Sequence, residues 1–480
     1  MAGDGPLVLT TEEAALLALQ NNQSFRVDRL NPPIQSTSEM EERSRYDPTL
    51  AARISGSRQR FEQEREFFGG REDVTQIDTN AEASLTQFLP GGTGIGLDVS
   101  TSRVFSNPDE GQEDEHTTRV GLTVTQALLR GYGTKPNLAR IRQARIDTRS
   151  SEYELRSAAE QLVASAESTF WDYVLARRRI EIFTESLELA RQQLRETEER
   201  IRLGRVARSE LAAARAEAAR RREELINARS EMETTRLRLL RLVNPGVPEQ
   251  WERKVDLLGE PEPPDTELGP VSEHVELALH MRPDLNQARL QVKRGDLEVV
   301  RTENGMLPRL NMFVQAGKSG IGDRFGHSLG DMENDAYDVL GGLDYQFPPY
   351  NREARARHRR AVLTRAQAVE AVRNLEQVVQ VDVRSAYIEV DRAREQVTAT
   401  AATRRFRQES LDAETEKFRV GKSTSFLVAQ AQRDLVESEI AEVEARVNYL
   451  KALIELYRLE GSLLERRGIR APGVHKVALR

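Results

Sequence analysis

Few stretches of this sequence combine residue types and spacing that chemistry requires, and the first candidate is a lysine–serine motif. Gly421-Lys422-Ser423-Thr424 is similar to the end of a phosphate-binding loop. The complete motif has another glycine five residues earlier, where this chain has Glu416, and it follows a strand rather than a helix. Residues 91–96 are rich in glycine but have strand patterns on both sides, so they predict a hairpin turn and not a dinucleotide site.

The residue types that bind metals do not have the spacing of a metal site either. The chain has no cysteine, which excludes disulfides and thiolate metal sites. Acidic runs at 109–115 and 331–338 could bind divalent ions, but solvated loops explain them better. His274 and His280 are expected on a helix surface. The six histidines as a set show no metal-ligand spacing: His116, His274, His280, His327, His358 and His475. The sequence thus predicts a protein that has no cofactor and is not an enzyme.

The composition indicates long, thin helical packing. Of the 480 residues, 31% are charged, 38% hydrophobic and only 5% aromatic, which suits helices that each bury one stripe. A net charge of -7 disfavours nucleic acid as a partner. No apolar run reaches the about 18–20 residues of a membrane-spanning helix, so any crossing of a membrane would have to use strands.

The first residues, 1–6, carry neither a basic start nor an apolar segment, so no signal peptide is visible. We therefore expect the chain either to be cytosolic or to be given in its mature form.

Two very long helices must position everything else. Residues 136–203 and 352–420 contain no internal proline and no glycine, and at about 1.5 Å per residue each would be roughly 100 Å long. Apolar residues recur every seven positions along both stretches, which indicates coiled packing against a neighbouring helix. The first seam comprises Ile180, Leu187, Leu194 and Ile201, and the second comprises Val383, Val390, Val397, Leu411 and Phe418, with Arg404 in the gap.

The chain is internally duplicated. Residues 272–279 resemble residues 11–19, and the interval from Ala18 to Pro48 equals that from Ala278 to Pro308, an offset of 260. Gly204 and Gly421, which end the long helices, are offset by only 217. The difference of 43 residues corresponds to an extra strand hairpin in the first repeat, near residues 84–104.

This duplication predicts the domain organisation. Repeat 1 (1–244) contains short helices (9–45), strands with the extra hairpin (48–129), a long helix (136–203) and a returning helix (207–242). A Pro-rich linker (245–270) follows. Repeat 2 (271–465) contains helices (271–306), strands (309–347), a long helix (352–420) and a returning helix (423–460). The pattern is lost after Gly461, so we expect loop or disorder there, and residues 466–480 form a tail.

At the level of motifs, the sequence resembles the outer membrane efflux protein family, the TolC-like trimeric channels. The resemblance rests on the opening segment 9–22 with its echo at 272–285, on the strand exit 122–133, and on the second turn, 418–432. It covers residues 8–465. It implies a mainly α fold with a β-barrel portion, in which a trimer forms a membrane β-barrel and a long α-helical barrel around an internal two-fold repeat.

The resemblance also implies a function. Such a protein would be the exit duct of a tripartite efflux pump or type I secretion system, in the bacterial outer membrane with its helical barrel in the periplasm. It would be a passive conduit in contact with outer membrane lipid. Its partners would be two further copies of itself, a periplasmic adaptor protein, and an inner-membrane pump or secretion ATPase.

Site residues follow from the same resemblance. The family often carries an acidic residue six positions after each turn glycine, at the pore constriction. Repeat 1 has Glu210 there, whereas repeat 2 has Leu427, with Gln430 where another acid can lie. The resemblance places adaptor docking at the two turns, which include Arg202, Gly204, Arg205, Arg419, Gly421 and Lys422. An acid in the first turn of a helix also complements the helix dipole, so Glu210 could simply stabilise its helix.

Two questions remain open from the sequence. A trimer could close twelve strands with the extra hairpin outside the barrel, or eighteen with it inside. The alternative function is a soluble or periplasmic coiled-coil scaffold or spacer, which the polar strands and the missing signal peptide favour but which has no use for the paired β segments. A periplasmic adaptor is disfavoured because that class lacks the duplicated layout.

Overall fold

The structure is a computed structural model that describes residues 6–64, 71–106, 113–204, 208–243, 251–262, 264 and 268–470. The chain divides into two compact units. Unit 1 comprises Met1–Pro33, Arg149–Arg289 and Ala371–Arg480, and unit 2 comprises Ile34–Thr148 and Leu290–Glu370. Each unit therefore takes segments from both sequence repeats.

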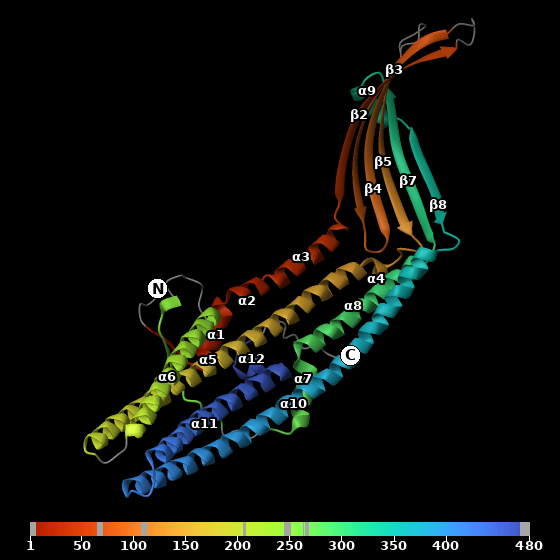
Figure 1. The fold of residues 1–480 in the computed structure, drawn as a ribbon. Helices are drawn as coiled ribbons and strands as arrows, with labels where there is room; N and C mark the ends of the chain where they lie inside the picture. The colour runs from red at the N-terminus through yellow and green to blue at the C-terminus, as the bar shows by residue number, and fades with distance from the viewer. Residues whose placement is uncertain are drawn as a thin grey trace. The chain divides into compact units, whose positions relative to one another are not determined.

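Unit 1 is built on two helical hairpins (Figure 1). The 64-residue helix α5 (Ala139–Arg202) is followed by α6 (Arg208–Val243), and the 68-residue helix α10 (Arg352–Arg419) is followed by α11 (Ser425–Glu460). The first residues of α5 and α10 belong to unit 2. Both returning helices have 36 residues, so the offset of 217 between the turn glycines also relates α6 to α11.

Shorter elements pack against these hairpins. Thr10 caps α1 through a capping box in which its hydroxyl accepts from the Glu13 amide and the Glu13 carboxylate accepts from the Thr10 amide. A small parallel pair of strands, β1 and β6, was missed by the sequence interpretation, which placed β6 in a Pro-rich linker. The remaining elements of unit 1 are β1 (Leu7–Leu9), α1 (Thr11–Asn21), α2 (Gln23–Asp28), β6 (Val255–Leu257), α7 (Val271–Met281) and α12 (Leu463–Arg466).

The core of unit 1 buries apolar residues both on and off the heptad seams. Phe170 and Val174 of α5 are buried with residues of α1, α6, β1 and β6. Val383 and Val390 of α10 are buried against α7 and α11. Phe170 and Val174 lie off the heptad seam of α5, and the chain's own short elements bury them.

Unit 2 is dominated by one six-stranded antiparallel sheet, ordered β2-β3-β4-β5-β7-β8 (Figure 1). The extra hairpin of repeat 1 is part of this sheet, because β3 and β4 lie between β2 and β5. The strands are β2 (Thr49–Glu64), β3 (Arg71–Phe88), β4 (Thr93–Ser106), β5 (Glu113–Ala127), β7 (Arg309–Gly322) and β8 (Tyr337–Gln346). The helical elements are α3 (Asn31–Ser44), α4 (Thr134–Asn137), α9 (Phe325–Gly330), the 3-10 turn η2 (Asp331–Glu333), and α8 (Pro283–Gly305), whose first residues belong to unit 1.

Two strands of the sheet, β2 and β3, extend beyond the others. The β3–β4 ladder ends at the pair Gln76–Ser106, whereas the β2–β3 ladder continues to Glu64–Arg71. Beyond residue 76, β2 and β3 therefore form a two-stranded ribbon. Within the described part of the chain, no helix is both long and apolar enough to cross a membrane.

Candidate functional site

Each long helix ends at a glycine in the left-handed conformation. The φ angles are 71° at Gly204 and 74° at Gly421, values that cost a side-chain-bearing residue about 1 kcal/mol and glycine almost nothing. At Gly421 the amide of Lys422 reaches back to the carbonyl of Lys417 (2.8 Å), which satisfies a carbonyl at the helix end. The turns reverse the chain because these two positions are glycine.

The motif that is similar to a phosphate-binding loop is part of this second turn. The Ser423 hydroxyl donates to the carboxylate of Glu414 in the preceding helix. The side chain of Thr424 caps α11 by accepting from the Leu427 amide. These residues therefore end one helix and start the next.

The three predicted constriction residues lie in the first turns of the returning helices. Glu210 is half-buried in the first turn of α6, and its carboxylate accepts from the Ser425 hydroxyl at the start of α11. Leu427 and Gln430 are exposed on α11. The structure thus places Glu210 in contact with the other hairpin, whereas the side chains of Leu427 and Gln430 are exposed to solvent in the single chain.

Among the predicted docking residues, the cationic ones project from the turns. Arg202 and Arg419 are exposed, and each pairs with an exposed glutamate one turn earlier in its own helix (2.6 Å to Glu199 and 3.1 Å to Glu416). Lys422 is also exposed. Arg205 lies outside the described residues.

Further contacts join the two hairpins near the turns. Arg433 of α11 donates to Glu217 of α6 (3.0 Å), and its guanidinium lies over the ring of Phe426. Arg200 of α5 lies over the ring of Phe418 of α10, 4.9 Å from its centre. Together with the contact between Glu210 and Ser425, these interactions connect repeat 1 to repeat 2 at the turn end. We call this set the hairpin ties.

The turn glycines give a first testable prediction. Alanine at Gly204 or Gly421 is expected to lower the free energy of unfolding by about 1 kcal/mol, from backbone strain alone. No other atom lies within 4 Å of the Cβ that either change would add. Thermal unfolding followed by circular dichroism at the helix band would measure the loss. Gly305→Ala is the matched control, since its added Cβ is also unobstructed and it has no left-handed backbone. A loss as large at Gly305 as at the turns would contradict the strain argument.

The register of the sheet in unit 2 separates an apolar face from a polar face. On β5, Val120, Leu122 and Val124 alternate with Arg119, Gly121 and Thr123, and paired residues on neighbouring strands lie on the same side. We define the apolar face by the side chains that share the side of Val120: Leu50, Ala52, Ile54, Ala81, Ala83, Leu85, Ile95, Leu97, Val99, Val120, Leu122, Val124, Met312, Val314, Ala316, Val339, Leu343 and Tyr345. Most of its large members are exposed.

The polar face carries a row of charges across four strands. Arg119 of β5 pairs with Asp98 of β4 (3.2 Å) and Asp338 of β8 (2.8 Å). Its guanidinium lies over Gly121 and Gly317, where an added Cβ would come within 2.6 Å of it. The two glycines thus allow one arginine to lie flat on the sheet between two carboxylates.

The polar residues of β2 fit this division. Ser55 and Gln59 are on the polar face. Arg58 and Arg60 share the side of the apolar face, but they lie at its margin. Arg58 is opposite Ile77, next to the last pair of the β3–β4 ladder, and Arg60 lies on the two-stranded ribbon, where it pairs with Asp73 (2.5 Å). The apolar face itself is free of charged side chains between Leu50 and Ile54.

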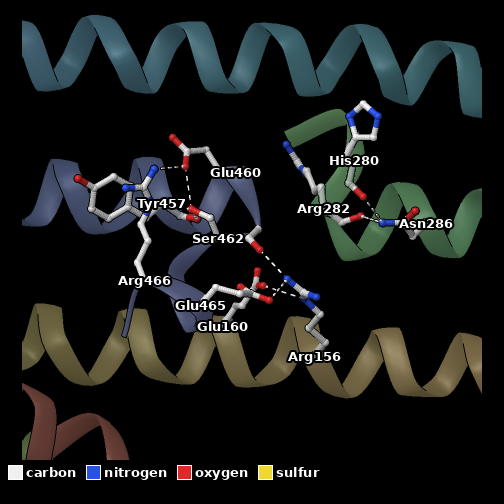
Figure 2. Close-up of polar contacts among 11 residues, drawn as sticks. Arg156, Glu160, His280, Arg282, Asn286, Tyr457, Glu460, Ser462, Glu465 and Arg466 are labelled. Atoms are coloured by element: carbon white, nitrogen blue, oxygen red, sulfur yellow. Dashed lines mark hydrogen bonds and ion pairs between the residues drawn. The ribbon is translucent and has the colours of Figure 1, made fainter. Parts of the chain in front are cut away.

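A buried set of ion pairs joins α5 to the C-terminal segment of unit 1 (Figure 2). Arg156 donates to Glu160 (3.2 Å), to the carbonyl of Gly461 (2.7 Å) and to Glu465 (2.7 Å). Burial raises the pKa of Glu160 to about 7, against the opposing effect of Arg156. We call these ion pairs, together with those of Glu167 and Glu460, the C-terminal clamp.

Two more buried glutamates complete the C-terminal clamp. Glu167 of α5 accepts two hydrogen bonds from Arg467 (2.7 and 2.8 Å). Glu460 accepts from Ser462 (2.7 Å) and Arg466 (3.3 Å), as Figure 2 shows, and it pairs with the ring of His274. The expectation that His274 lies on a helix surface is wrong, because its side chain is buried and its Nε2 has no hydrogen-bond partner among the described residues.

The sequence interpretation also missed α12, having assigned loop or disorder to everything after Gly461. Leu463 and Leu464 are fully buried against α5 and α1. A signal was present: Glu160 and Glu167 are seven residues apart, on the side of α5 that also carries the buried Val163. Charged residues that recur within an apolar stripe require partners from elsewhere in the chain.

The acidic run at 331–338 has local roles. Asp331 accepts from the Ile321 amide (3.0 Å), and Asp338 pairs with Arg119. Asp109 and Glu110 of the other run lie outside the described residues. Among the residues that the structure does describe, no group of three or more acidic or histidine side chains is placed to hold a metal ion.

Comparison with known proteins gives the chain its relatives. Residues 274–462 match the family model described as outer membrane efflux protein. The outer membrane efflux protein BepC of Brucella suis is 23% identical over 395 residues, which are 82% of this chain and 81% of BepC. The alkaline protease secretion protein AprF of Pseudomonas aeruginosa is 30% identical over 193 residues, 39% of this chain and 40% of AprF.

Solved structures agree at the level of the fold. The CmeC outer membrane channel of Campylobacter jejuni superposes with a TM-score of 0.70 and 15% identity, covering 94% of this chain and 86% of CmeC. The predicted fold class, mainly α with a sheet portion and similar to TolC-like channels, is thus confirmed, although the sheet of one chain does not close. Over most of its length, the chain is thus similar to outer membrane efflux proteins.

Proposed function

We propose that this protein is the outer membrane exit duct of a tripartite efflux pump or type I secretion system, a passive conduit without chemistry of its own. The observation that carries the proposal is the two-faced sheet of unit 2. An exposed apolar face backed by a polar face is what a strand-built membrane wall requires, since one side meets lipid and the other meets water. A coiled-coil scaffold has no use for such a sheet.

Closure of the sheet requires more copies of the chain. In one chain β2 and β8 are the edges, and an unpaired edge cannot stay in lipid. With the extra hairpin inside the sheet, each copy supplies six strands. A homotrimer would then close eighteen strands rather than twelve, with the Arg119 row facing the lumen. The resemblance to trimeric channels supports three copies.

The turns of unit 1 are the proposed docking surface for a periplasmic adaptor protein, which would connect the duct to an inner-membrane pump or secretion ATPase. Arg202, Arg419 and Lys422 are exposed cations on a short, regular surface formed by two similar turns. Such a surface suits a partner with an acidic helical tip. Glu210, Leu427 and Gln430 would line the constriction just inside the turns.

The hairpin ties would hold the constriction closed. Each partly exposed tie contributes about 1 kcal/mol, so removing one shifts the equilibrium between closed and open states by about five-fold. Single-channel recording in planar bilayers tests this directly. We expect Ser425→Ala and Arg433→Ala to increase the open probability about five-fold over the wild type.

The control for this experiment is Arg195→Ala. Arg195 is exposed and pairs with Glu188 of its own helix (3.4 Å), so its loss leaves the hairpin ties intact. Its open probability should match the wild type. If the purified protein gives no pore under any salt or pH condition, the conduit proposal fails. If it gives pores that the two variants do not open further, only the role of the hairpin ties fails.

A further inference from the structure

The short helix α9, between β7 and β8, is seated on the apolar face of the sheet. The hydroxyls of Ser328 in α9 and Thr118 in β5 are 2.7 Å apart, and both residues are fully buried. Thr118 lies on the same side of β5 as Val120 and Leu122, because side chains alternate along a strand. The helix therefore covers one end of the apolar face.

Two glycines of β7 let the helix approach the sheet backbone. A Cβ on Gly320 would lie 2.2 Å from the carbonyl oxygen of Ser328, and one on Gly322 would lie 2.7 Å from its amide nitrogen. Gly320 pairs with Thr118 and Gly322 with His116, so both are on the side of the apolar face. The backbone of α9 thus packs on bare strand backbone, and its position is fixed.

While Ser328 points into the sheet, two large apolar side chains of α9 are left uncovered. Phe325 and Leu329 are 51% and 50% exposed, and they are four residues apart, on one side of the helix. A surface element gains nothing from exposing a phenylalanine and a leucine to water. Together they continue the exposed apolar surface on top of the strand ends that α9 covers.

The depth of α9 follows from the register of β8. Tyr337 and Tyr345 bracket the apolar residues of this strand, and at about 3.3 Å per residue they are roughly 26 Å apart, close to the height of a lipid-facing band with its aromatic borders. Tyr337 pairs with Lys318, and a tyrosine beside a lysine is typical of a membrane–water interface. Gly320 and Gly322 lie two and four residues beyond Lys318, so α9 is just outside this border.

From this placement we propose that α9 is an interfacial helix on the outer wall of the duct. Its partner is membrane lipid at the boundary between head groups and acyl chains, which Phe325 and Leu329 enter. The inference rests on the proposed function, in which the apolar face meets lipid. β5 leads into α4 at the end of the sheet opposite to α9. In the proposed function the helices are on the periplasmic side, so α9 is at the other side of the membrane and meets the lipid of the outer leaflet.

Tryptophan fluorescence in liposomes tests the proposal on the full-length protein. The chain's two tryptophans, Trp171 and Trp251, are first replaced by phenylalanine. Single reporters are then introduced by Phe325→Trp, by Leu329→Trp as a second reporter on α9, by Val314→Trp in the apolar face midway between the levels of Tyr337 and Tyr345, and by Gln315→Trp on the polar face. Each protein is reconstituted in phosphatidylcholine brominated either near the head group or near the chain end.

We expect the α9 reporters to lose roughly half of their emission to bromines near the head group and much less to bromines near the chain end. Val314→Trp should show the reverse order, and Gln315→Trp should be quenched by neither lipid. If Val314→Trp is quenched while both α9 reporters behave like Gln315→Trp, α9 does not touch lipid and the inference is overturned, although the duct proposal stands. Stronger quenching of α9 by the deep bromines would also overturn it. If Val314→Trp is not quenched, the sheet is not in lipid and the proposed function fails as well.

Discussion

Replacing Arg467 by alanine is expected to lower the free energy of unfolding of this protein by about 3–5 kcal/mol, because the change leaves a buried carboxylate without its partner. Glu167 is fully buried on α5, and both of its oxygens accept from Arg467 (2.7 and 2.8 Å). Burial raises the pKa of Glu167 even with the guanidinium in place. Thermal unfolding in detergent, followed by circular dichroism, would measure the loss.

A matched surface pair provides the control. Arg178 of α5 pairs with Glu181 (2.6 Å), and both side chains are about half exposed. Arg178→Ala should therefore cost less than about 1 kcal/mol. Replacing both members of the buried pair, Glu167→Met with Arg467→Met, should recover most of the stability, since the uncompensated charge is gone. A loss in Arg467→Ala no greater than in Arg178→Ala would show that the pair is not buried in solution.

The loss of stability in Arg467→Ala should become smaller at low pH. Removal of the arginine takes away an interaction that lowers the pKa of Glu167, so this carboxyl binds its proton more tightly in the folded state. The deficit relative to the wild type should then shrink as the pH falls and the carboxyl becomes neutral. A deficit that grows at low pH would contradict this assignment.

The parts of the fold that sequence could predict are those set by local or repeated patterns. The seven-residue spacing of Val383 and Val390 and the glycines at 204 and 421 determine long helices with sharp ends, and the structure has both. The 43-residue difference between repeats predicted an extra hairpin near residues 84–104, and the hairpin of β3 and β4 spans residues 71–106. Its place inside the sheet depends on which strand edges pair, and strand pairing over such distances is not written in any local pattern.

The C-terminal clamp escaped prediction for a different reason. His274 contacts both Tyr387 and Glu460, which come from two other segments, and a lone histidine or glutamate in a helix looks like ordinary helix surface. The internal repeat contained the missing information. By the two offsets, these positions correspond to Ala14, Phe170 and Val243, which are all buried in a single apolar cluster of repeat 1.

Corresponding positions of the two repeats occupy equivalent places in the fold. A position that is buried and apolar in one copy is expected to be buried in the other, whatever its residue type. A histidine and a glutamate at two such positions therefore predict a buried pair rather than two surface charges. The predicted site residues gain no such help, because Glu210 is only half-buried and Leu427, its counterpart by the offset of 217, is exposed, so burial in one copy says little about the other.

The second large effect is a dependence of stability on pH that comes from Glu160. Its carboxyl is almost fully buried beside Arg156 on α5, and burial raises its pKa from 4.5 to about 7. A carboxyl whose pKa is higher in the folded state binds more protons when folded between these two values. Its contribution to the free energy of unfolding is therefore greatest below pH 4.5, falls as the pH rises to 7, and is constant above. The shift corresponds to about 3 kcal/mol.

The variant Glu160→Gln isolates this contribution, because glutamine keeps an oxygen that accepts from Arg156 but cannot ionise. Other carboxyl groups make both proteins depend on pH, so the quantity to measure is the difference in free energy of unfolding between variant and wild type. We expect this difference to shift in favour of the variant by about 3 kcal/mol between pH 4.5 and pH 7.5. Gln161→Ala, at the exposed neighbouring position, replaces one neutral side chain by another, and its difference from the wild type should be flat across the same range. A difference that does not change with pH for Glu160→Gln would contradict the raised pKa of Glu160. It would mean that water reaches this carboxyl in the folded protein, and therefore that the C-terminal clamp opens in solution although its ion pairs are formed in the structure.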